Sequence, residues 1–354
     1  MHRCLELAKL GRGSVAPNPM VGALLVHDDQ IIGEGYHKAY GGPHAEVNAV
    51  SNAIDIGNEK LLQESTMYVN LEPCSHFGRT PPCSDLIIRH KIPRVVIGSR
   101  DPFPEVDGKG IEKLQAAGLK VKMGVLEGAC KELNKRFFSF QTLKRPYIIL
   151  KWAETANRMI SAGEGKKRLM ISNDYSNFIV HKWRGEEVGI MVGTNTALGD
   201  NPSLTTRFWP GRSPVRIVVD LNLRLPSSLK IFDEEGMTIV FNSRLQTPEE
   251  DWPTNFAEKG RVNPLYYQVN TDEALIRQVA HGLYRLNIQS ILVEGGARLL
   301  ESFIDEGLWD EARVIRNTDM NVEDGLAAPE LSKMIKVSEQ TLFTDVLEIY
   351  KPVH

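Results

Sequence analysis

The chain has 354 residues, more than one ordinary hydrophobic core organises, so its length predicts two domains. Hydrophobic residues make up 42% and charged residues 25% of it, and no apolar run approaches the roughly 18 residues of a membrane helix, which excludes an integral membrane protein. The formal net charge of -3, with no concentrated basic block, argues against nucleic acid as a partner and favours a small metabolite.

The N-terminal segment MHRCLELAKLGRG has no apolar core followed by a cleavage site, so we expect an amphipathic helix there and no secretion signal. The four cysteines, Cys4, Cys74, Cys83 and Cys130, do not form a dense disulfide framework. Such sparse thiols favour a reducing cytoplasm and either metal-binding or unreactive roles.

The first part of the chain alternates strand-like and helix-like segments. A hairpin is predicted from 21–26 and 30–36 around Asp28-Asp29, because two apolar runs flank a short polar turn. Alternating strands and helices predict an α/β sandwich. The further elements expected in this part are a helix at 44–54, a strand at 66–73, a helix at 82–90, a strand with its loop at 93–102, a helix and strand within 110–126, and a closing helix followed by a short link within 131–146.

A new strand at 146–153 begins a second alternation, which places the domain boundary near residue 145. The expected domains are therefore 1–144 and 145–354, the second being another α/β domain. Its further predicted strands lie at 189–194, 215–220, 237–243 and 290–296, with helical stretches between them.

Potential metal ligands lie at the ends of three predicted elements. His44-Ala45-Glu46 opens a helix, and Cys74 follows Pro73 and precedes Cys83 by nine positions. One imidazole and two thiolates complete the three protein ligands of a catalytic zinc, whose fourth position is left to water. Glu46 is close enough in sequence to move protons beside that water without binding the metal.

This arrangement resembles the HxE and P-C motifs of zinc-dependent deaminases, although the two cysteines are separated by eight residues rather than two. The alternative is a redox or structural zinc pair. A closed structural site needs a fourth ligand, for which His76 in the intervening loop is the candidate.

The loop PCSHFGRTPPC (73–83), together with APNPMVGALLV (16–26) and GGPHAEVNAV (41–50), closely resembles the bifunctional riboflavin-biosynthesis deaminase/reductase family. The resemblance runs through essentially the whole chain. It implies an N-terminal α/β/α sandwich similar to cytidine deaminases and a C-terminal α/β domain similar to dihydrofolate reductase. It also implies zinc in the first domain, NADPH in the second, and a phosphoribosylated diaminopyrimidinone as the first substrate.

The resemblance also implies roles for individual residues. In the first domain, His44, Cys74 and Cys83 would bind zinc, Glu46 would shuttle protons, and Asn18, His76 and Arg79 would contact the substrate. Without the resemblance, the sequence around Asn18 predicts only a turn, and His76 and Arg79 are expected to belong to a solvated loop. In the second domain the implied substrate contacts are Lys151, Arg184, Leu204, Arg207 and Glu294, and the implied cofactor contacts are Ala153, Thr196, Asp200, Gly295, Gly296, Ala297 and Arg298.

The second half contains no GxGxxG after a strand, so a Rossmann fingerprint is absent. The candidate phosphate site is Gly295-Gly296, between a predicted strand and a helix beginning near Ala297. Backbone N–H groups and the dipole at a helix N-terminus can hold a phosphate there. A glycine pair at this place is also ordinary turn chemistry.

The chain departs from the family pattern in one stretch. Asn157-Arg158 replaces an Asp-Gly pair, Leu169 stands where a tryptophan is expected, and the segment 313–331 is also unusual. This stretch leaves open a C-terminal domain that binds ligand or assembles subunits without reducing. A second alternative is a deaminase of another base, such as a tRNA adenosine or a free nucleobase, against which the acidic net charge and the 200-residue extension argue. The sequence leaves homo-oligomerisation and channelling between the sites open.

Overall fold

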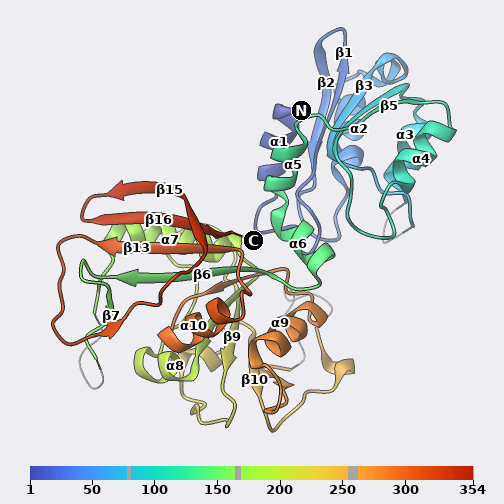
Figure 1. Cartoon of the computed structure of the whole chain (residues 1–354). Helices are drawn as coiled ribbons and strands as arrows, with labels where there is room; N and C mark the ends of the chain where they lie inside the picture. Colours follow the sequence, from blue (N-terminus) through green and yellow to red (C-terminus); the bar gives the residue numbers. More distant parts are fainter. Residues whose placement is uncertain (78–80, 164–168, 254–261, 354) are drawn as a thin grey trace. The chain divides into compact units, whose positions relative to one another are not determined.

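The computed structural model describes residues 1–77, 81–163, 169–253 and 262–353 (Figure 1). The chain divides into two compact units, Met1–Lys144 and Arg145–His354. Among the described residues, no helix combines the length and the apolar character that crossing a membrane requires. Arg79 lies outside the described residues, so its predicted role receives no structural account.

The first unit contains a five-stranded sheet in the order β2-β1-β3-β4-β5 (Figure 1). The hairpin of β1 and β2 is antiparallel, and Asp28 and Asp29 both have the positive φ that a tight two-residue hairpin turn requires. β3, β4 and β5 are parallel to one another. The strands are β1 (Gly22–His27), β2 (Gln30–Tyr36), β3 (Thr66–Leu71), β4 (Arg94–Ser99) and β5 (Lys120–Lys122).

Helices cover both faces of this sheet. Alternate side chains of one strand point to opposite faces, so their packing partners identify the helices on each face. Ala23 and Leu25 of β1 pack in the core cluster that includes α2, whereas Leu24 packs against Cys4 and Leu7 of α1. This gives the predicted three-layer sandwich. The helices are α1 (His2–Lys9), α2 (Ala45–Asp55), α3 (Cys83–Arg89), α4 (Lys109–Ala116), α5 (Glu127–Leu133) and α6 (Lys135–Leu143), with a 3₁₀ helix at Glu59–Glu64.

The closing helix and short link predicted within 131–146 differ from the structure in one respect, because two helices meet at Asn134 where one continuous helix is predicted. The buried side chain of Asn134 accepts a hydrogen bond from Met20 N (2.8 Å) and donates one to Met20 O (2.9 Å). Asn134 thus binds a distant loop and leaves the helical conformation, with φ -102° and ψ 21°.

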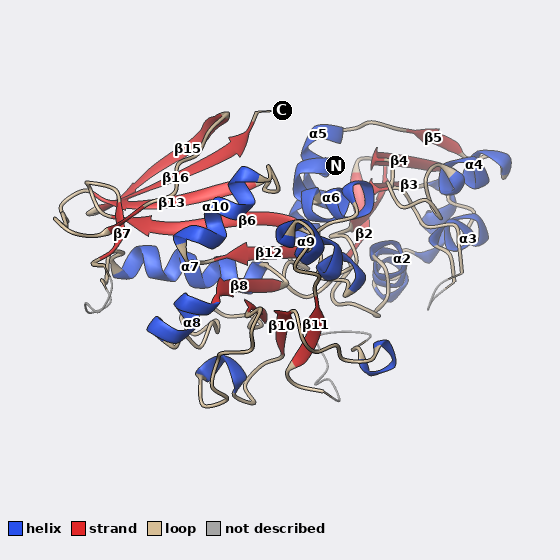
Figure 2. Ribbon diagram, turned by 60° about the horizontal axis from the view of Figure 1, so that its bottom comes forward, coloured by secondary structure: helices blue, strands red, loops and turns tan. Residues whose placement is uncertain are grey.

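The second unit contains a nine-stranded sheet in the order β11-β10-β9-β8-β12-β6-β13-β16-β15 (Figure 2). Its strands are parallel except at one edge, where β16 runs antiparallel to β13 and pairs with β15. The strands are β6 (Tyr147–Glu154), β8 (Gly189–Gly193), β9 (Val215–Val219), β10 (Thr238–Asn242), β11 (Leu265–Gln268), β12 (Ser290–Val293), β13 (Glu311–Asn317), β15 (Met334–Leu342) and β16 (Asp345–Pro352).

The two faces of this sheet carry different helices. Ile149 of β6 packs with Val180 and Trp183 of α7, whereas Ile148 and Leu150 belong to the cluster that includes α9 and α10. Lys151 and Ala153 therefore lie on the α7 side of β6. The remaining elements are α7 (Asp174–Glu186), α8 (Thr194–Asp200), α9 (Leu275–Arg285), α10 (Ala297–Asp305), the strand pair β7 (Met159–Ser161) and β14 (Leu326–Ala327), and 3₁₀ helices at Lys230–Phe232 and Glu249–Asp251.

Candidate active sites

Three potential metal ligands converge in the first unit. His44 is the N-cap of α2, Cys74 follows the end of β3, and Cys83 begins α3. The Nδ1 atom of His44 lies 3.5 Å from Cys74 Sγ and 3.3 Å from Cys83 Sγ. Ligands of a tetrahedral zinc stand about 3.6 Å apart, given metal bonds of about 2.1 and 2.3 Å. The one nitrogen and two sulfurs therefore fit zinc in chemistry and in spacing.

The pKa values of the three potential metal ligands are shifted in different directions by their mutual hydrogen bonds. A hydrogen bond from the Cys83 thiol, more than any other cause, lowers the pKa of Cys74 to about 4. The hydrogen bond with Cys74 raises the pKa of His44 to about 9, and the same partner raises the pKa of Cys83. The low pKa of Cys74 favours its thiolate form, which is the form that binds a metal cation, and binding would displace the protons of the other two donors.

Glu46 lies in the first turn of α2 with 3% of its surface exposed. Burial is the largest cause that raises the pKa of its carboxyl group, while the charge of His44 acts in the opposite direction. A carboxyl group whose pKa is raised toward neutrality can both accept and release a proton at cellular pH.

Cys74 is held in place by the residue two positions before it. The buried carboxylate of Glu72 accepts hydrogen bonds from the backbone N–H groups of Gly108 (3.1 Å), Gly110 (3.0 Å) and Ile111 (3.3 Å). These donors lie at the N-terminus of α4, where the helix dipole favours a negative charge. The end of β3, and with it the Pro73-Cys74 segment, is thereby fixed to α4.

Charged residues also converge in the second unit, on the α7 side of its sheet. Arg184 of α7 makes a paired salt bridge with Glu294, with Nε–Oε1 at 2.8 Å and Nη2–Oε2 at 2.6 Å. Burial opposes ionisation of Glu294, but the Arg184 guanidinium holds the pKa of this carboxyl group below its usual value. Arg184 also donates to Thr205 O, in the segment that carries Arg207.

His181 connects Arg207 to the same cluster. Arg207 N donates to His181 Nδ1 at 3.0 Å, and His181 lies one helical turn before Arg184. Burial, followed by the charges of Arg184 and Arg207, lowers the pKa of His181 to about 4, and Lys151 contributes in the same direction. Arg184, Arg207 and Lys151 thus bring three cations around His181, with Glu294 as the one carboxylate, which makes this region attractive to an anion such as a phosphate.

The predicted cofactor residues meet at the N-terminus of α10. Gly296 is the N-cap of α10, which begins at Ala297 and continues with Arg298. A Cβ atom on Gly295 would lie 3.2 Å from Thr196 Cγ2, and one on Gly296 would lie 3.1 Å from Thr196 Oγ1. The glycine pair and α8 are therefore close neighbours. Asp200 lies one turn beyond Thr196 on α8, and the two share a face of that helix.

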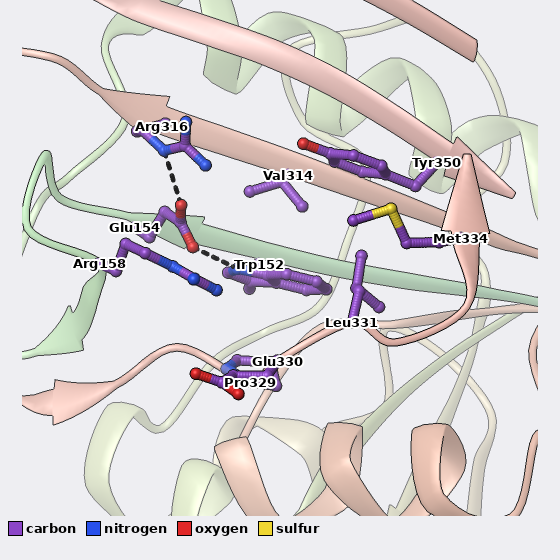
Figure 3. A pocket seen from close by; sticks show the side chains of 10 residues that line it. All are labelled: Trp152, Glu154, Arg158, Val314, Arg316, Pro329, Glu330, Leu331, Met334 and Tyr350. Carbon is purple, nitrogen blue, oxygen red and sulfur yellow. Dashed lines mark hydrogen bonds and ion pairs between the residues drawn. The ribbon is translucent and has the colours of Figure 1, made fainter. Parts of the chain in front are cut away.

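A pocket of about 270 Å³ opens on the other side of β6 (Figure 3). It is lined by Trp152 and Glu154, which alternate with Lys151 and Ala153 and so lie on the opposite face of the sheet. Glu154 accepts hydrogen bonds from Trp152 Nε1 (2.9 Å) and from Arg316 Nε (2.8 Å) (Figure 3). The residues predicted for substrate and cofactor do not line this pocket.

The unusual Asn157-Arg158 pair forms a turn beside this pocket. Asn157 Oδ1 accepts from Thr155 Oγ1 (2.7 Å), and its Nδ2 donates to Val322 O (2.7 Å). Arg158 has φ 61°, a conformation that favours the glycine of the family pattern. The turn is therefore retained without glycine, and the Arg158 side chain lies over Trp152 (Figure 3).

Comparison with known proteins matches both units to families. Residues 1–99 match the model described as the cytidine and deoxycytidylate deaminase zinc-binding region, and residues 146–317 match the RibD C-terminal domain. The riboflavin biosynthesis protein RibD of Aquifex aeolicus is 39% identical over 99% of this chain and 97% of its own length.

The chain belongs to the RibD family. The RibD of Escherichia coli is 35% identical over 88% of this chain and 84% of its own length. A Thermotoga maritima structure of a diaminohydroxyphosphoribosylaminopyrimidine deaminase/5-amino-6-(5-phosphoribosylamino)uracil reductase superposes with a TM-score of 0.87 at 35% identity, covering 100% of this chain and 97% of that one. As a RibD, the chain is a bifunctional deaminase and reductase of riboflavin biosynthesis that uses zinc and NADPH.

The structure separates the predicted residues of this chain into groups. His76 lies outside the group of three metal ligands, and its ring contacts Phe103 at a centroid distance of 5.9 Å. A closed zinc site with His76 as the fourth ligand is therefore not what the described residues form. Leu204 is buried in a core cluster with Ala197 and Leu229, so its side chain packs in the core rather than facing a ligand.

The sequence did not single out His37, Glu72 or His181. His37 lies beside the metal cluster, with its ring centroid 5.5 Å from that of His44, and Asn18 Nδ2 lies 3.1 Å from His37 Nε2. For His181 a signal existed, because it precedes Arg184 by three positions on one helix face. No sequence signal existed for His37 or Glu72, since their hydrogen-bond partners are backbone atoms and side chains distant in sequence.

Proposed function

We propose that Met1–Lys144 removes an amine from 2,5-diamino-6-(5-phosphoribosylamino)pyrimidin-4(3H)-one, and that Arg145–His354 reduces the ribose of the product to a ribityl chain. The observation that supports the first step most strongly is the His44, Cys74 and Cys83 donor set beside the buried Glu46. Three protein donors leave a tetrahedral metal one position for a small ligand, which is the arrangement of a catalytic zinc site.

In the deamination, each residue near the cluster has a separate task. Zinc, when bound by His44, Cys74 and Cys83, supplies Lewis acidity. Glu46 takes one proton from the attacking water and passes it to the ring nitrogen, then takes the second proton from the newly attached hydroxyl group and passes it to the amine, which leaves as ammonia. Burial raises the pKa of the Glu46 carboxyl group, which favours uptake of a proton from water. Asn18 contacts the pyrimidine edge.

In the reduction, the residues of the second unit orient two ligands. Lys151, Arg184 and Arg207 supply positive charge for the substrate phosphate, and Glu294 holds Arg184 in place. Gly295, Gly296 and the first N–H groups of α10 suit the cofactor phosphates, with Thr196 beside them. NADPH donates the hydride, so no protein nucleophile is needed. The residues contribute proximity and orientation.

A coupled assay tests this proposal. Zinc-loaded protein is mixed with the phosphoribosyl diaminopyrimidinone and NADPH, and the release of ammonia and the oxidation of NADPH are followed together. We expect ammonia first and NADPH oxidation after it. Turnover of a free nucleoside with none of the phosphoribosyl compound would contradict the proposed substrate, and ammonia without NADPH oxidation would leave the second unit a binding domain.

A further inference from the structure

His37 connects two parts of the deaminase site that are separate in sequence. It follows the end of β2 and is 2% exposed. Its Nδ1 atom lies 3.0 Å from the carbonyl oxygen of Pro43, the residue directly before His44. Its Nε2 atom lies 3.1 Å from Nδ2 of Asn18, in the loop that precedes β1. One imidazole thus joins the Asn18 loop to the start of α2.

The partners of His37 determine which of its nitrogens carries the hydrogen. A backbone carbonyl can only accept, so the nitrogen that faces Pro43 must be the donor. A buried imidazole between a carbonyl and an amide has no acidic partner that would favour a second proton. The Nε2 atom is therefore an acceptor, which is the role that the observed contact with an amide NH₂ group requires.

This tautomer has a consequence for Asn18. If Nε2 of His37 accepts, the side-chain NH₂ of Asn18 must face it, and Oδ1 must face elsewhere. Among the residues that the structure describes, none donates a hydrogen bond to this Oδ1 atom, although the backbone N–H of Asn18 is satisfied by Val15 O. Asn18 thus presents an unused acceptor in a fixed orientation beside the metal cluster.

We propose that His37 is a positioning residue that locks the Asn18 amide so that Oδ1 accepts a hydrogen bond from an N–H group on the edge of the substrate ring. The proposal rests on the proposed deaminase function of the first unit. It makes the site selective for rings that offer a donor at that edge, such as an aminopyrimidinone, over rings that offer only a lone pair there. A site that must pair a buried polar group rejects a ligand that leaves the group unpaired.

Two substitutions of His37 separate the contact with Asn18 from the contact with Pro43. The amide of His37→Gln can place its oxygen near the Nε2 position and keep an acceptor for Asn18. The amide of His37→Asn reaches only the Nδ1 position, so it keeps the donor for Pro43 and loses the acceptor. We expect His37→Asn to weaken substrate binding about tenfold or more relative to His37→Gln, with KM rising more than kcat falls.

The affinities are measured in the Glu46→Gln background, by calorimetry with zinc-loaded protein and the phosphoribosyl diaminopyrimidinone. The measured affinities rank the His37 variants whether or not the wild-type protein turns the compound over. Failure of the deaminase proposal is therefore recognised separately, by the absence of turnover in wild type. Zinc content is measured for every variant. We expect it to be unchanged, because His37 does not belong to the donor set.

A double-mutant cycle completes the test. If His37 acts through Asn18, then adding His37→Asn to Asn18→Ala causes no further loss of affinity. Multiplicative losses in the double variant, equal binding by His37→Asn and His37→Gln, or absence of binding by zinc-loaded Glu46→Gln protein would each overturn the proposal. Loss of zinc from His37→Asn would also do so, since it would show that His37 supports the metal cluster itself.

Discussion

Glu46 combines near-complete burial with a position two residues from a metal ligand. For Glu46→Gln, we expect deamination to fall by about 10²–10⁴-fold, because an amide of the same shape cannot transfer the proton. The zinc content should stay at one ion per chain, since the carboxyl group is not among the three donors. Ammonia release and metal analysis of the same sample check both statements. A variant that loses its zinc would show that Glu46 is a ligand.

His181 makes the second unit sensitive to acid. Its pKa is about 4 in the folded chain against an ordinary value of 6.5. Above about pH 6.5 the imidazole is neutral in both states, and between about 6.5 and 4 only the unfolded chain takes up the proton. We therefore expect the free energy of unfolding of the second unit to decrease as the pH falls from about 6.5 toward 4, because protonation of His181 favours the unfolded chain.

The measurement compares urea unfolding of wild type and His181→Asn at about pH 8 and about pH 5. All five tryptophans lie between residues 152 and 309, so tryptophan fluorescence reports on the second unit alone. The variant keeps an acceptor for Arg207 N and should lose less stability on acidification than wild type. His281→Asn, at an exposed position on α9, is the matched control. Equal pH dependence in all three proteins would contradict the assignment.

Arg158 occupies a backbone conformation that favours glycine, with φ 61°. We expect Arg158→Gly to be more stable than Arg158→Ala by about 1 kcal/mol, because both lack the side chain and only glycine is relaxed at this φ. Urea unfolding followed by tryptophan fluorescence gives the difference. Equal stability of the two variants would mean that the turn adopts another conformation in solution.

The metal cluster and Glu46 could be predicted from the sequence because their chemistry is concentrated in two short motifs. His44 and Glu46 are separated by one residue, and Cys74 follows a proline at a strand end. His37 could not be predicted in the same way, since its role depends on a carbonyl oxygen and on an amide 19 residues away. Neither partner leaves a pattern in the sequence around His37.

At the scale of elements, α4 packs closely against the segment before Cys74. A Cβ atom on Gly110 would lie 2.1 Å from the carbonyl oxygen of Pro73. Backbone must therefore move if any side chain is introduced there. Because Pro73 directly precedes Cys74, we expect this movement to reach the metal cluster.

For Gly110→Ala, we expect zinc affinity to fall about tenfold or more, as measured by competition with a chelating dye. Gly128→Ala is the matched control, because its Cβ atom would meet nothing within 4 Å and it also lies in a helix of the first unit. Unchanged zinc affinity in Gly110→Ala would mean that α4 can shift without carrying Cys74 with it.

Most central strands of both sheets could be predicted from apolar runs, since these strands are buried. The edge formed by β15 and β16 escaped prediction for the opposite reason. Eight of the nine residues of β15 are exposed, so this strand has no buried face to produce an alternating pattern. The central strand β13 was missed, because Glu311, Arg313 and Arg316 interrupt its apolar run. The break between α5 and α6 also escaped, because it depends on the contact of Asn134 with Met20.

At the scale of the whole molecule, the metal donors and the reductase cluster belong to different units. We therefore expect a zinc chelator to abolish ammonia release without slowing NADPH oxidation, provided that the deaminated intermediate is supplied directly. Both rates are measured on the same chelated protein, and addition of zinc should restore the first. Parallel loss of the two activities would show that the reductase depends on the metal.

The strand order of the second unit also governs the sequence of events during synthesis. The last strand of the first unit ends at Lys122, so all strands of its sheet are translated early. In the second unit, β6 pairs with β12 and β13, which begin only at Ser290 and Glu311 and are translated much later. Domains generally fold as units as they leave the ribosome. The nascent first unit can therefore fold and acquire its metal while the strands that flank β6 are still untranslated, which leaves the apolar strand β6 without its partners until they emerge.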